Sequence, residues 1–285
     1  QNLTTANLNA LTTDELARFT TAQIRALTTT QLANLTTGNL TALGTAQYAA
    51  LNSDQVNALT TGQVRSLETA DVRAITTAAL AGLTSTQVGA LTTDGVQALT
   101  TAQVANLTSD QLKGMTTADM VALTSSQVAA LNSIQAPSLN TDQLRAIEVA
   151  DIKALSTADI KALDTAQINA LTNGQLQALS SAQIVALTTD QVQNLTTANL
   201  NALTTDELAR FTTAQVRALT TTQIANLTTG NLDALGTAQY AALTSNQVNA
   251  LTTGQVRALE TADVRSITTA ALAGLTSTQV GALTT

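Results

Sequence analysis

The residues that could carry acid–base chemistry in this chain are carboxylates, because the sequence contains no histidine and no cysteine. Composition therefore excludes the usual general base, the thiol nucleophile and the usual nitrogen and sulfur ligands of zinc. Two adjacent acid pairs remain, Asp14-Glu15 and Asp206-Glu207. Acids near the start of a helix are ordinary surface residues that face the helix dipole. We predict no catalytic, cofactor-binding or metal-binding residue, and a protein that is not an enzyme.

Charge and hydropathy restrict the partners and the location of the chain. The net charge is -7, and the 12 Lys and Arg residues are scattered along the 285 residues. Nucleic-acid binding normally needs a basic patch, so we expect no nucleic-acid partner. No apolar run approaches the roughly 18 residues that a membrane helix needs, so we expect no membrane span. Aromatic residues make up 1% and hydrophobic residues 44% of the chain, which predicts a folded protein with a thin, regular core.

The sequence is a tandem array of an eight-residue unit, whose positions we label a to h from Leu3. Position a recurs 36 times without a slip in register, and position f is apolar in all 35 octads. Position a is Leu apart from six exceptions: Phe19, Ile75, Met115, Ile147, Phe211 and Ile267. Position h is mostly Ala, and position c is Ser or Thr except at Val149 and Asn173.

A longer period lies over the octads. Residues 193–285 repeat residues 1–93 with seven differences, at an offset of 192 residues or 24 octads. Duplication by whole octads predicts that each octad is a structural unit stacked on its neighbours. We expect one continuous octapeptide-repeat solenoid over residues 1–285, as a section of a longer array. Tyr48 and Tyr240 are related by this period, as are Phe19 and Phe211, and we expect all four to pack inside the coil.

Each octad carries the signals of a helix start. In Leu27-Thr28-Thr29-Thr30-Gln31-Leu32, Thr at b is an N-cap and Gln at e completes a capping box, while the apolar a and f residues form a hydrophobic staple. Eighteen of the 19 acids lie at b, d or e, and all 12 bases lie at g or h. This is the distribution that a helix dipole favours. One continuous helix fails, because eight residues at about 100° leave the apolar stripe turned by about 80° per octad.

The sequence therefore predicts an all-α solenoid, a superhelical coil of very short helices with one helix per octad. The strict Ser or Thr at c fits this less well, since the cap is expected at b. Either the c hydroxyl bonds a backbone group on an adjacent turn, or c is itself the cap. The alternative fold is a β-solenoid with ladders of Thr, which explains position c but not the Gln at e or the sorted charges.

One octad departs from the pattern. In residues 131–138, position f is Ala136, position d is Ile134 and the only proline of the chain, Pro137, stands at g. Proline removes a backbone donor and disfavours helix for the residue before it. We interpret this octad as a degenerate repeat within the array, with a functional kink as the alternative.

The Leu-Thr-x-x-Gln-(Leu/Val) octads resemble the Thr/Ala-rich octapeptide tandem-repeat arrays of large secreted or surface, adhesin-like proteins of Gram-negative bacteria. The resemblance implies an extracellular or cell-surface structural protein, a filament, stalk or matrix fibre, with no cofactor. Its partners would be further copies in a fibre, or neighbouring repeats of a longer chain. The alternative function is a repeat-scaffold binding module that recognises a protein, a glycan or an ice surface through regularly spaced Thr.

Overall fold

The computed structural model describes residues 3–283, and every regular element in that range is a helix. Each of the 35 octads contains one helical segment: 33 are α-helices of four to six residues, and two are 3-10 helices. The all-α prediction with one short helix per octad is confirmed. The β-solenoid alternative is wrong, because no strand occurs among the described residues.

The chain divides into two compact units, Gln1–Leu155 and Ser156–Thr285. The helices of the first unit are α1 (Thr5–Ala10), α2 (Thr13–Ala17), α3 (Thr21–Arg25), α4 (Thr29–Ala33), α5 (Thr37–Thr41), α6 (Thr45–Tyr48), α7 (Ser53–Asn57), α8 (Thr61–Arg65), α9 (Thr69–Ala74), α10 (Thr77–Leu80), α11 (Ser85–Val88), α12 (Thr93–Ala98), α13 (Thr101–Ala105), α14 (Ser109–Gly114), α15 (Thr117–Ala122), α16 (Ser125–Val128), η1 (Ala136–Ser138), α17 (Thr141–Ala146) and η2 (Ile152–Ala154). Those of the second unit are α18 (Thr157–Ala162), α19 (Thr165–Ala170), α20 (Asn173–Gln177), α21 (Ser181–Ala186), α22 (Thr189–Gln193), α23 (Thr197–Ala202), α24 (Thr205–Leu208), α25 (Thr213–Ala218), α26 (Thr221–Asn226), α27 (Thr229–Asp233), α28 (Thr237–Ala242), α29 (Ser245–Asn249), α30 (Thr253–Ala258), α31 (Thr261–Ser266), α32 (Thr269–Leu272) and α33 (Ser277–Val280).

The helix starts follow the capping signals of the sequence. Thr108, at position b, has extended backbone angles (φ -72°, ψ 159°), and its hydroxyl accepts the N–H of Gln111 at 3.2 Å. The Gln111 side-chain oxygen in turn accepts the N–H of Thr108 at 2.9 Å. Position b is therefore the cap and position c is the first helical residue, which excludes the prediction that c is itself the cap. Helices that run to position h end where the next a residue leaves the helical region, as at Leu99 (φ -55°, ψ 133°).

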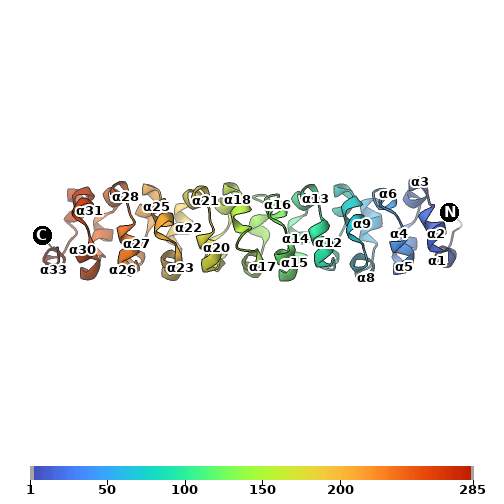
Figure 1. Cartoon of the computed structure of the whole chain (residues 1–285), viewed down its shortest axis with the longest axis horizontal. Helices are drawn as coiled ribbons and strands as arrows, with labels where there is room; N and C mark the ends of the chain where they lie inside the picture. Colours follow the sequence, from blue (N-terminus) through green and yellow to red (C-terminus); the bar gives the residue numbers. More distant parts are fainter. Residues whose placement is uncertain (1–2, 284–285) are drawn as a thin grey trace. The chain divides into compact units, whose positions relative to one another are not determined.

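Positions a and f form the core within each unit. Val104 is fully buried and Leu107 almost so, and the same holds for nearly all a and f residues between Ile24 and Val256. Helices three places apart in the first unit pack together, for example α6 on α9 and α11 on α14, and in the second unit α22 packs on α25. Figure 1 shows the helices of each unit following one another as successive turns of a coil.

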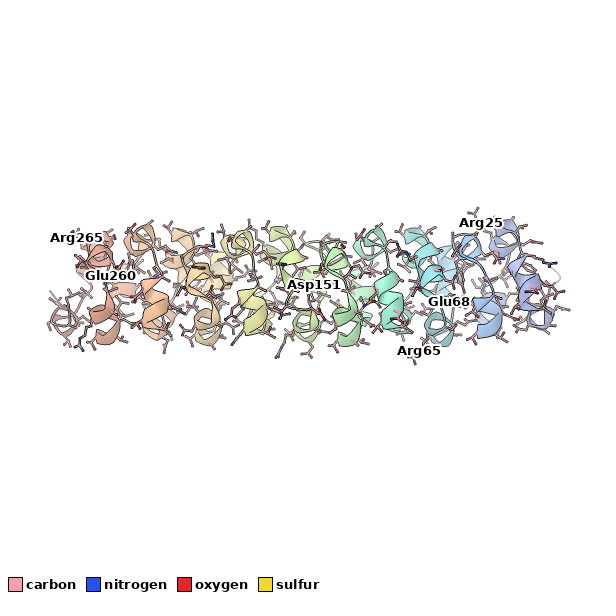
Figure 2. The ribbon with its side chains drawn as sticks, in the orientation of Figure 1. Arg25, Arg65, Glu68, Asp151, Glu260 and Arg265 are labelled. Carbon is pink, nitrogen blue, oxygen red and sulfur yellow. The ribbon has the colours of Figure 1, made fainter. Side chains whose placement is uncertain are left out.

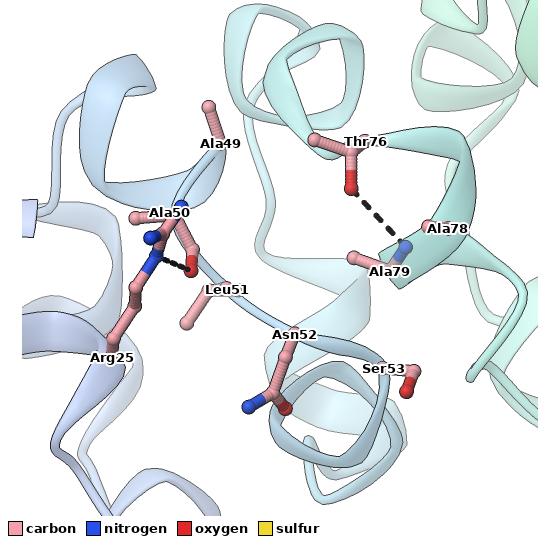
Figure 3. A pocket seen from close by; sticks show the side chains of 9 residues that line it. All are labelled: Arg25, Ala49, Ala50, Leu51, Asn52, Ser53, Thr76, Ala78 and Ala79. Atoms are coloured by element: carbon pink, nitrogen blue, oxygen red, sulfur yellow. Dashed lines mark hydrogen bonds between the residues drawn. The ribbon is translucent and has the colours of Figure 1, made fainter.

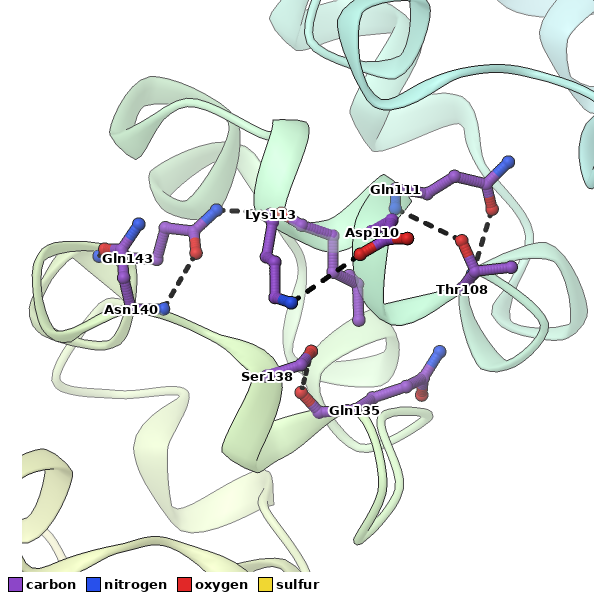
Figure 4. Close-up of polar contacts among 9 residues, drawn as sticks. Thr108, Asp110, Gln111, Lys113, Gln135, Ser138, Asn140 and Gln143 are labelled. Atoms are coloured by element: carbon purple, nitrogen blue, oxygen red, sulfur yellow. Dashed lines mark hydrogen bonds and ion pairs between the residues drawn. The ribbon is translucent and has the colours of Figure 1, made fainter.

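The turns of the coil are joined by the Gln side chains at position e. The Gln111 side-chain N–H₂ group donates to the carbonyl oxygens of Leu80 at 2.9 Å and Leu83 at 2.8 Å, which lie 31 and 28 residues earlier. Figure 4 includes this Gln together with Gln135 and Gln143, which make the same bonds to their own preceding turn. We call this series of inter-turn contacts the glutamine column.

The glutamine column has nearly constant geometry in both units. The side-chain N–H₂ groups donate to both carbonyls, at 2.8–2.9 Å for the offset of 31 residues and 2.7–2.8 Å for the offset of 28. The glutamines with these bonds include Gln47, Gln55, Gln63, Gln103, Gln111, Gln127, Gln135, Gln143, Gln191, Gln215, Gln223, Gln239, Gln247 and Gln255. One turn of the coil therefore takes about three and a half octads.

The Pro137 octad keeps its place in the column. Its helix is the 3-10 segment η1, but Gln135 still donates to Val104 at 2.9 Å and to Leu107 at 2.8 Å. Asn132 replaces Thr as the cap and accepts the Gln135 N–H at 3.2 Å. The contact between turns is therefore kept in this octad, which agrees with the interpretation as a degenerate repeat.

Glycine at position h allows the closest approach between turns. A Cβ atom on Gly114 would lie 2.1 Å from the carbonyl oxygen of Ser85, three octads earlier, and Gly82 faces Ser53 in the same way at 2.2 Å. In the second unit, Gly274 faces Ser245 at 2.3 Å. Each of these glycines faces a Ser and not a Thr at position c. A small residue therefore stands on each side of the contact.

The glutamine column predicts a large difference between two chemically identical substitutions. Gln111→Glu preserves the capping acceptor but replaces both inter-turn donors by a buried carboxylate facing carbonyl oxygens, and we expect a cost of about 3–5 kcal/mol. Gln23 makes the same capping box with Thr20, but its side-chain N–H₂ group donates no hydrogen bond within the described residues, so Gln23→Glu should change stability by less than about 0.5 kcal/mol.

Hydrogen exchange followed by mass spectrometry measures these two changes locally. Gln111→Glu should accelerate exchange in the peptides around α11 and α14 and leave distant octads unchanged, since each octad contacts only near neighbours. Equal exchange in Gln111→Glu and Gln23→Glu would show that the capping box alone holds the octads in place.

The close approach at position h allows a second comparison of two matched substitutions. Gly114→Ala should destabilise the first unit by about 3 kcal/mol, because the new methyl group meets a backbone oxygen that cannot move alone. Gly38→Ala, in α5, meets no atom within 4 Å and should stabilise by about 0.5–1 kcal/mol through helix propensity. Urea denaturation followed by circular dichroism reports both, and a stabilising Gly114→Ala would contradict the tight contact.

Candidate functional site

The two acid pairs of the sequence lie at helix starts. Asp14 and Glu15 begin α2, and Asp206 and Glu207 begin α24. Both glutamates complete capping boxes, accepting the N–H of Thr12 at 2.8 Å and of Thr204 at 2.7 Å. The bond from the Thr12 N–H lowers the pKa of Glu15. Asp14, Glu15 and Asp206 are exposed as expected, but Glu207 is only 7% exposed, which corrects the prediction of a surface acid.

Among residues 3–283, no group of three or more carboxylates is placed to hold a metal ion. Figure 2 shows Arg25, Arg65 and Glu68 at separate places on the first unit. The ion pair Lys113–Asp110, at 3.6 Å, joins two exposed side chains on α14, and such pairs contribute little to stability. No helix in the described range is long and apolar enough to cross a bilayer.

The tyrosines pack inside the coil, as predicted. Tyr48 and Tyr240 have no exposed surface, and their hydroxyls donate to the carbonyl oxygens of Leu40 and Leu232, each at 2.8 Å. Burial raises the pKa of both phenols. Phe211 is also buried, whereas Phe19, on the first turn of the coil, is partly exposed and packs less completely than the other three aromatic residues.

The chemistry of the coil changes where position e is not Gln. Gln fills 21 of the 35 e positions, and the others are Asn, Glu, Asp, Ala and Gly. They are Asn7, Glu15, Asn39, Asp71, Ala79, Gly95, Asp119, Asp151, Asp159, Asn199, Glu207, Asn231, Asp263 and Ala271. An ionised Asp or Glu has no donor, and Ala and Gly have no polar side chain, so carbonyls that Gln would satisfy need another partner at these octads.

Tyr48 supplies the missing donor at Asp71. In the register of the column, the f-position carbonyl that a Gln in place of Asp71 would bond belongs to Leu40, and this is the oxygen that accepts the Tyr48 hydroxyl. Asp71 still accepts a capping bond from the N–H of Glu68, at 3.4 Å. In the second unit, the Tyr240 hydroxyl donates to the Leu232 carbonyl, which is the one that a Gln in place of Asp263 would bond. Sequence reasoning missed this exchange of donors, although both tyrosines stand three octads before an Asp at e.

Asp71 is a buried carboxyl group with little to stabilise its charge. It is 5% exposed, and burial, followed by the charge of Glu68, raises its pKa to about 6, against the lowering effect of the Glu68 N–H. In the folded chain its neutral form is therefore favoured below about pH 6, higher than for an ordinary aspartate.

A cavity of about 400 Å³ opens at Ala79, where the glutamine column is interrupted. Residues 49–53 line one side, with Arg25, and Thr76, Ala78 and Ala79 line the other. Figure 3 shows Arg25 and Ala50 facing Thr76 and Ala79 across this space. A second cavity, of about 300 Å³, lies between Leu3, Phe19 and Gln31 on the first turns of the coil.

Side chains at position g make a second contact between turns. They donate to the carbonyl of the h residue 25 positions later, as Asn57 does to Gly82 at 2.7 Å and Arg25 to Ala50 at 3.3 Å. In the second unit, Asn201 donates to Asn226 at 2.7 Å and accepts the N–H of Thr228 at 3.2 Å. Polar g residues thus cap the ends of helices on the following turn.

Comparison with known proteins identifies the repeat. A protein-family model described as the ALTTAQ repeat matches residues 1–37, 33–68, 64–101, 144–181, 170–197, 197–229, 227–261 and 256–285. The eight matches confirm the tandem array and leave out residues 102–143. Gln111, Gln127 and Gln135 in that stretch keep their inter-turn bonds. The coil therefore continues through a stretch that the family model does not match. A search of curated proteins found no match.

Asp71 predicts a pH dependence with a definite sign. Because its pKa is higher in the folded than in the unfolded chain, folding binds a proton, and the stability it contributes below about pH 4 is lost as the pH rises to about 6. Asp71→Asn should therefore stabilise the first unit at about pH 7.5, by about 2 kcal/mol, with little effect near pH 4.

Urea denaturation at both pH values measures this difference, with Asp54→Asn, at an exposed position in α7, as the control. The control should change stability by less than about 0.5 kcal/mol at either pH. A benefit from Asp71→Asn that is the same at both pH values would mean that Asp71 does not titrate in this range.

Proposed function

The chain belongs to the ALTTAQ repeat family, and on that premise we propose that it is a structural repeat protein of an extracellular filament, stalk or matrix fibre. The observation that carries this proposal is the glutamine column, in which the same two hydrogen bonds recur along each unit. A coil built in this way lengthens by whole octads without any new kind of contact. The property that such a coil would contribute to a fibre or stalk is its length.

The duplication of 24 octads supports the same function. It restores the same outward-facing residues after 192 positions, apart from a few substitutions. Lateral contacts made by one super-repeat can therefore recur at the next, in a fibre of several chains or in a longer chain. We extend this to the whole sequence and propose a continuous solenoid over residues 1–285, with its own kind or neighbouring repeats as its partners.

The extracellular location rests on resemblance and composition. The octads resemble the Thr/Ala-rich arrays of secreted, adhesin-like Gram-negative proteins, and the absence of cysteine suits export without disulfides. The net charge of -7 disfavours nucleic acid as a partner. A non-enzymatic role is part of this proposal, because the sequence has no histidine or cysteine and its hydroxyls serve as helix caps.

A series of chain lengths tests the proposal. We propose comparing the 285-residue chain with one that carries an additional 192-residue super-repeat. Small-angle X-ray scattering should give a maximum dimension that rises in proportion to the number of octads, and electron microscopy should show particles of uniform width. A concentration series separates a stalk, whose length is fixed by one chain, from a filament, which grows with concentration.

Compact particles would contradict a spacer function. If the added super-repeat increased the maximum dimension only as the cube root of the mass, the coil would be folding back on itself. A compact monomer that bound a defined protein, glycan or ice surface would favour the binding-module function instead.

A further inference from the structure

Asn-x-Thr triplets are acceptors for N-linked glycosylation, which attaches a sugar to the amide nitrogen of the asparagine side chain. The chain contains six such triplets, and five of them have their asparagine within residues 3–283. All five read Asn-Leu-Thr, so the triplet itself does not distinguish them. Their asparagines are Asn34, Asn39, Asn106, Asn194 and Asn226. Their surroundings in the fold therefore decide which of them a transferring enzyme can reach.

Four of the five triplets lie at an exposed corner of the coil. Their asparagine is at position h, where one helix ends, and their Thr is at position b, where the next helix is capped. The Asn and the Thr are exposed in each of the four, and only the Leu between them is buried. The Thr backbone is extended, with ψ of 159° at Thr108 and 154° at Thr228. The four asparagines are Asn34, Asn106, Asn194 and Asn226.

The reactive amide of these triplets is open to solvent. Asn106 Nδ2 donates one N–H to the carbonyl oxygen of Ala102 at 2.8 Å, and its second N–H makes no hydrogen bond within the described residues. The other three asparagines make the same bond at 2.8–2.9 Å. The Thr108 hydroxyl accepts the N–H of Gln111 but donates to no group in the described range. An enzyme can therefore bind the hydroxyl proton and replace the free N–H of the amide by a sugar without breaking either bond.

Asn39 has the same triplet in a different environment. It is at position e, and residues 39–41 all lie within α5. Its side chain is 8% exposed and faces the preceding turn, where Nδ2 lies 3.4 Å from the carbonyl oxygens of Leu8 and Asn9. A sugar on this nitrogen would need the space that the preceding turn fills. In the second super-repeat, Asn231 is buried in the same way, but Asp233 replaces the Thr and removes the triplet.

We propose that the chain is an acceptor for N-linked glycosylation at Asn34, Asn106, Asn194 and Asn226, and that burial protects Asn39. In this step Nδ2 forms a bond to C1 of a sugar, and the bond from C1 to a phosphate oxygen of the activated sugar breaks. The phosphate group leaves with the bonding electron pair, and Nδ2 releases one proton. The co-reactant is a sugar activated by a phosphate ester at C1, and the transferring enzyme is a separate protein.

Peptide mapping by mass spectrometry tests the proposal on the chain isolated from its native source. Electron-transfer fragmentation locates an added sugar on a single residue, and it should find sugar on the four exposed asparagines and none on Asn39. The absence of sugar at all four, or equal occupancy at Asn39, would overturn the proposal.

Asn34 and Asn39 provide a control within one chain, because the same triplet occurs twice within eight residues. The folded 285-residue chain is incubated with an N-glycosyltransferase specific for Asn-x-Thr and with a nucleoside diphosphate glucose. Asn34 should react at least about tenfold faster than Asn39, since a buried side chain reacts only through local opening of the fold. A synthetic peptide of residues 28–45, without neighbouring turns, should react at both positions. Equal rates in the folded chain would contradict protection by burial.

Two substitutions at position b separate the acceptor triplet from the helix cap. Thr108→Ser keeps both the triplet hydroxyl and the cap, so Asn106 should still be modified. Thr108→Asn removes the triplet and keeps a cap, as at Asn140, which accepts the Gln143 N–H at 2.9 Å. Asn106 should then stay unmodified, with an unchanged circular dichroism spectrum. Modification of Asn106 in Thr108→Asn would contradict recognition of the triplet. None of these results depends on chain length, so they are independent of the fibre proposal.

Discussion

A Gln carboxamide has one acceptor oxygen and one N–H₂ group with two donors, and the coil uses all of them. The oxygen accepts the cap N–H of its own helix, and the N–H₂ group donates to two carbonyls on the preceding turn. A helix of four to six residues satisfies few of its own N–H and C=O groups, since four of each remain open at its ends. Such a helix persists only if neighbouring turns supply the missing partners, and the side chain at e meets that requirement at both ends.

The other features of the coil follow from keeping these carbonyls satisfied. Where Asp71 removes the donor, the Tyr48 hydroxyl reaches the same Leu40 oxygen. Where the Pro137 octad forms a 3-10 helix in place of an α-helix, Gln135 keeps both bonds. Where Ala79 removes the polar side chain, the octad keeps its Thr76 cap, which accepts the Ala79 N–H at 3.2 Å. The core of a and f residues supplies the apolar burial, but it does not specify which residues of two neighbouring turns meet. The two bonds from each Gln to the preceding turn specify this register.

Much of the local structure could be predicted from the residues of a single octad. Thr28 and Gln31 give the helix start, and the apolar a and f residues give the buried face, because caps and staples are local interactions. The contact between turns is not local, so no single octad shows it. A signal was nevertheless present: 21 glutamines but only two glutamates occupy position e, although either residue completes a capping box. Only the amide can also donate to a second turn.

The role of position c could not be predicted from the sequence. One of the two expectations was a hydrogen bond from the c hydroxyl to the backbone of an adjacent turn. The Ser125 hydroxyl at position c does reach another turn, but it donates to the Asp151 carboxylate and not to a backbone group. The structure instead places the backbone of c against position h three octads later, most closely at Ser85 and Gly114. This contact explains the glycine at position h in these octads. It depends on the pitch of the coil, which the octad alone does not specify.

The exchange of Gln side-chain amide protons with solvent, measured by NMR on a chain labelled with ¹⁵N-glutamine, tests the central interaction most directly. Each side-chain N–H₂ of the column donates twice while almost fully buried, whereas that of Gln23 donates no hydrogen bond within the described residues. The account predicts slow exchange for Gln47 through Gln143 in the first unit and fast exchange for Gln23. Fast exchange at all of these positions would contradict it, because the turns would then be held together by apolar packing alone.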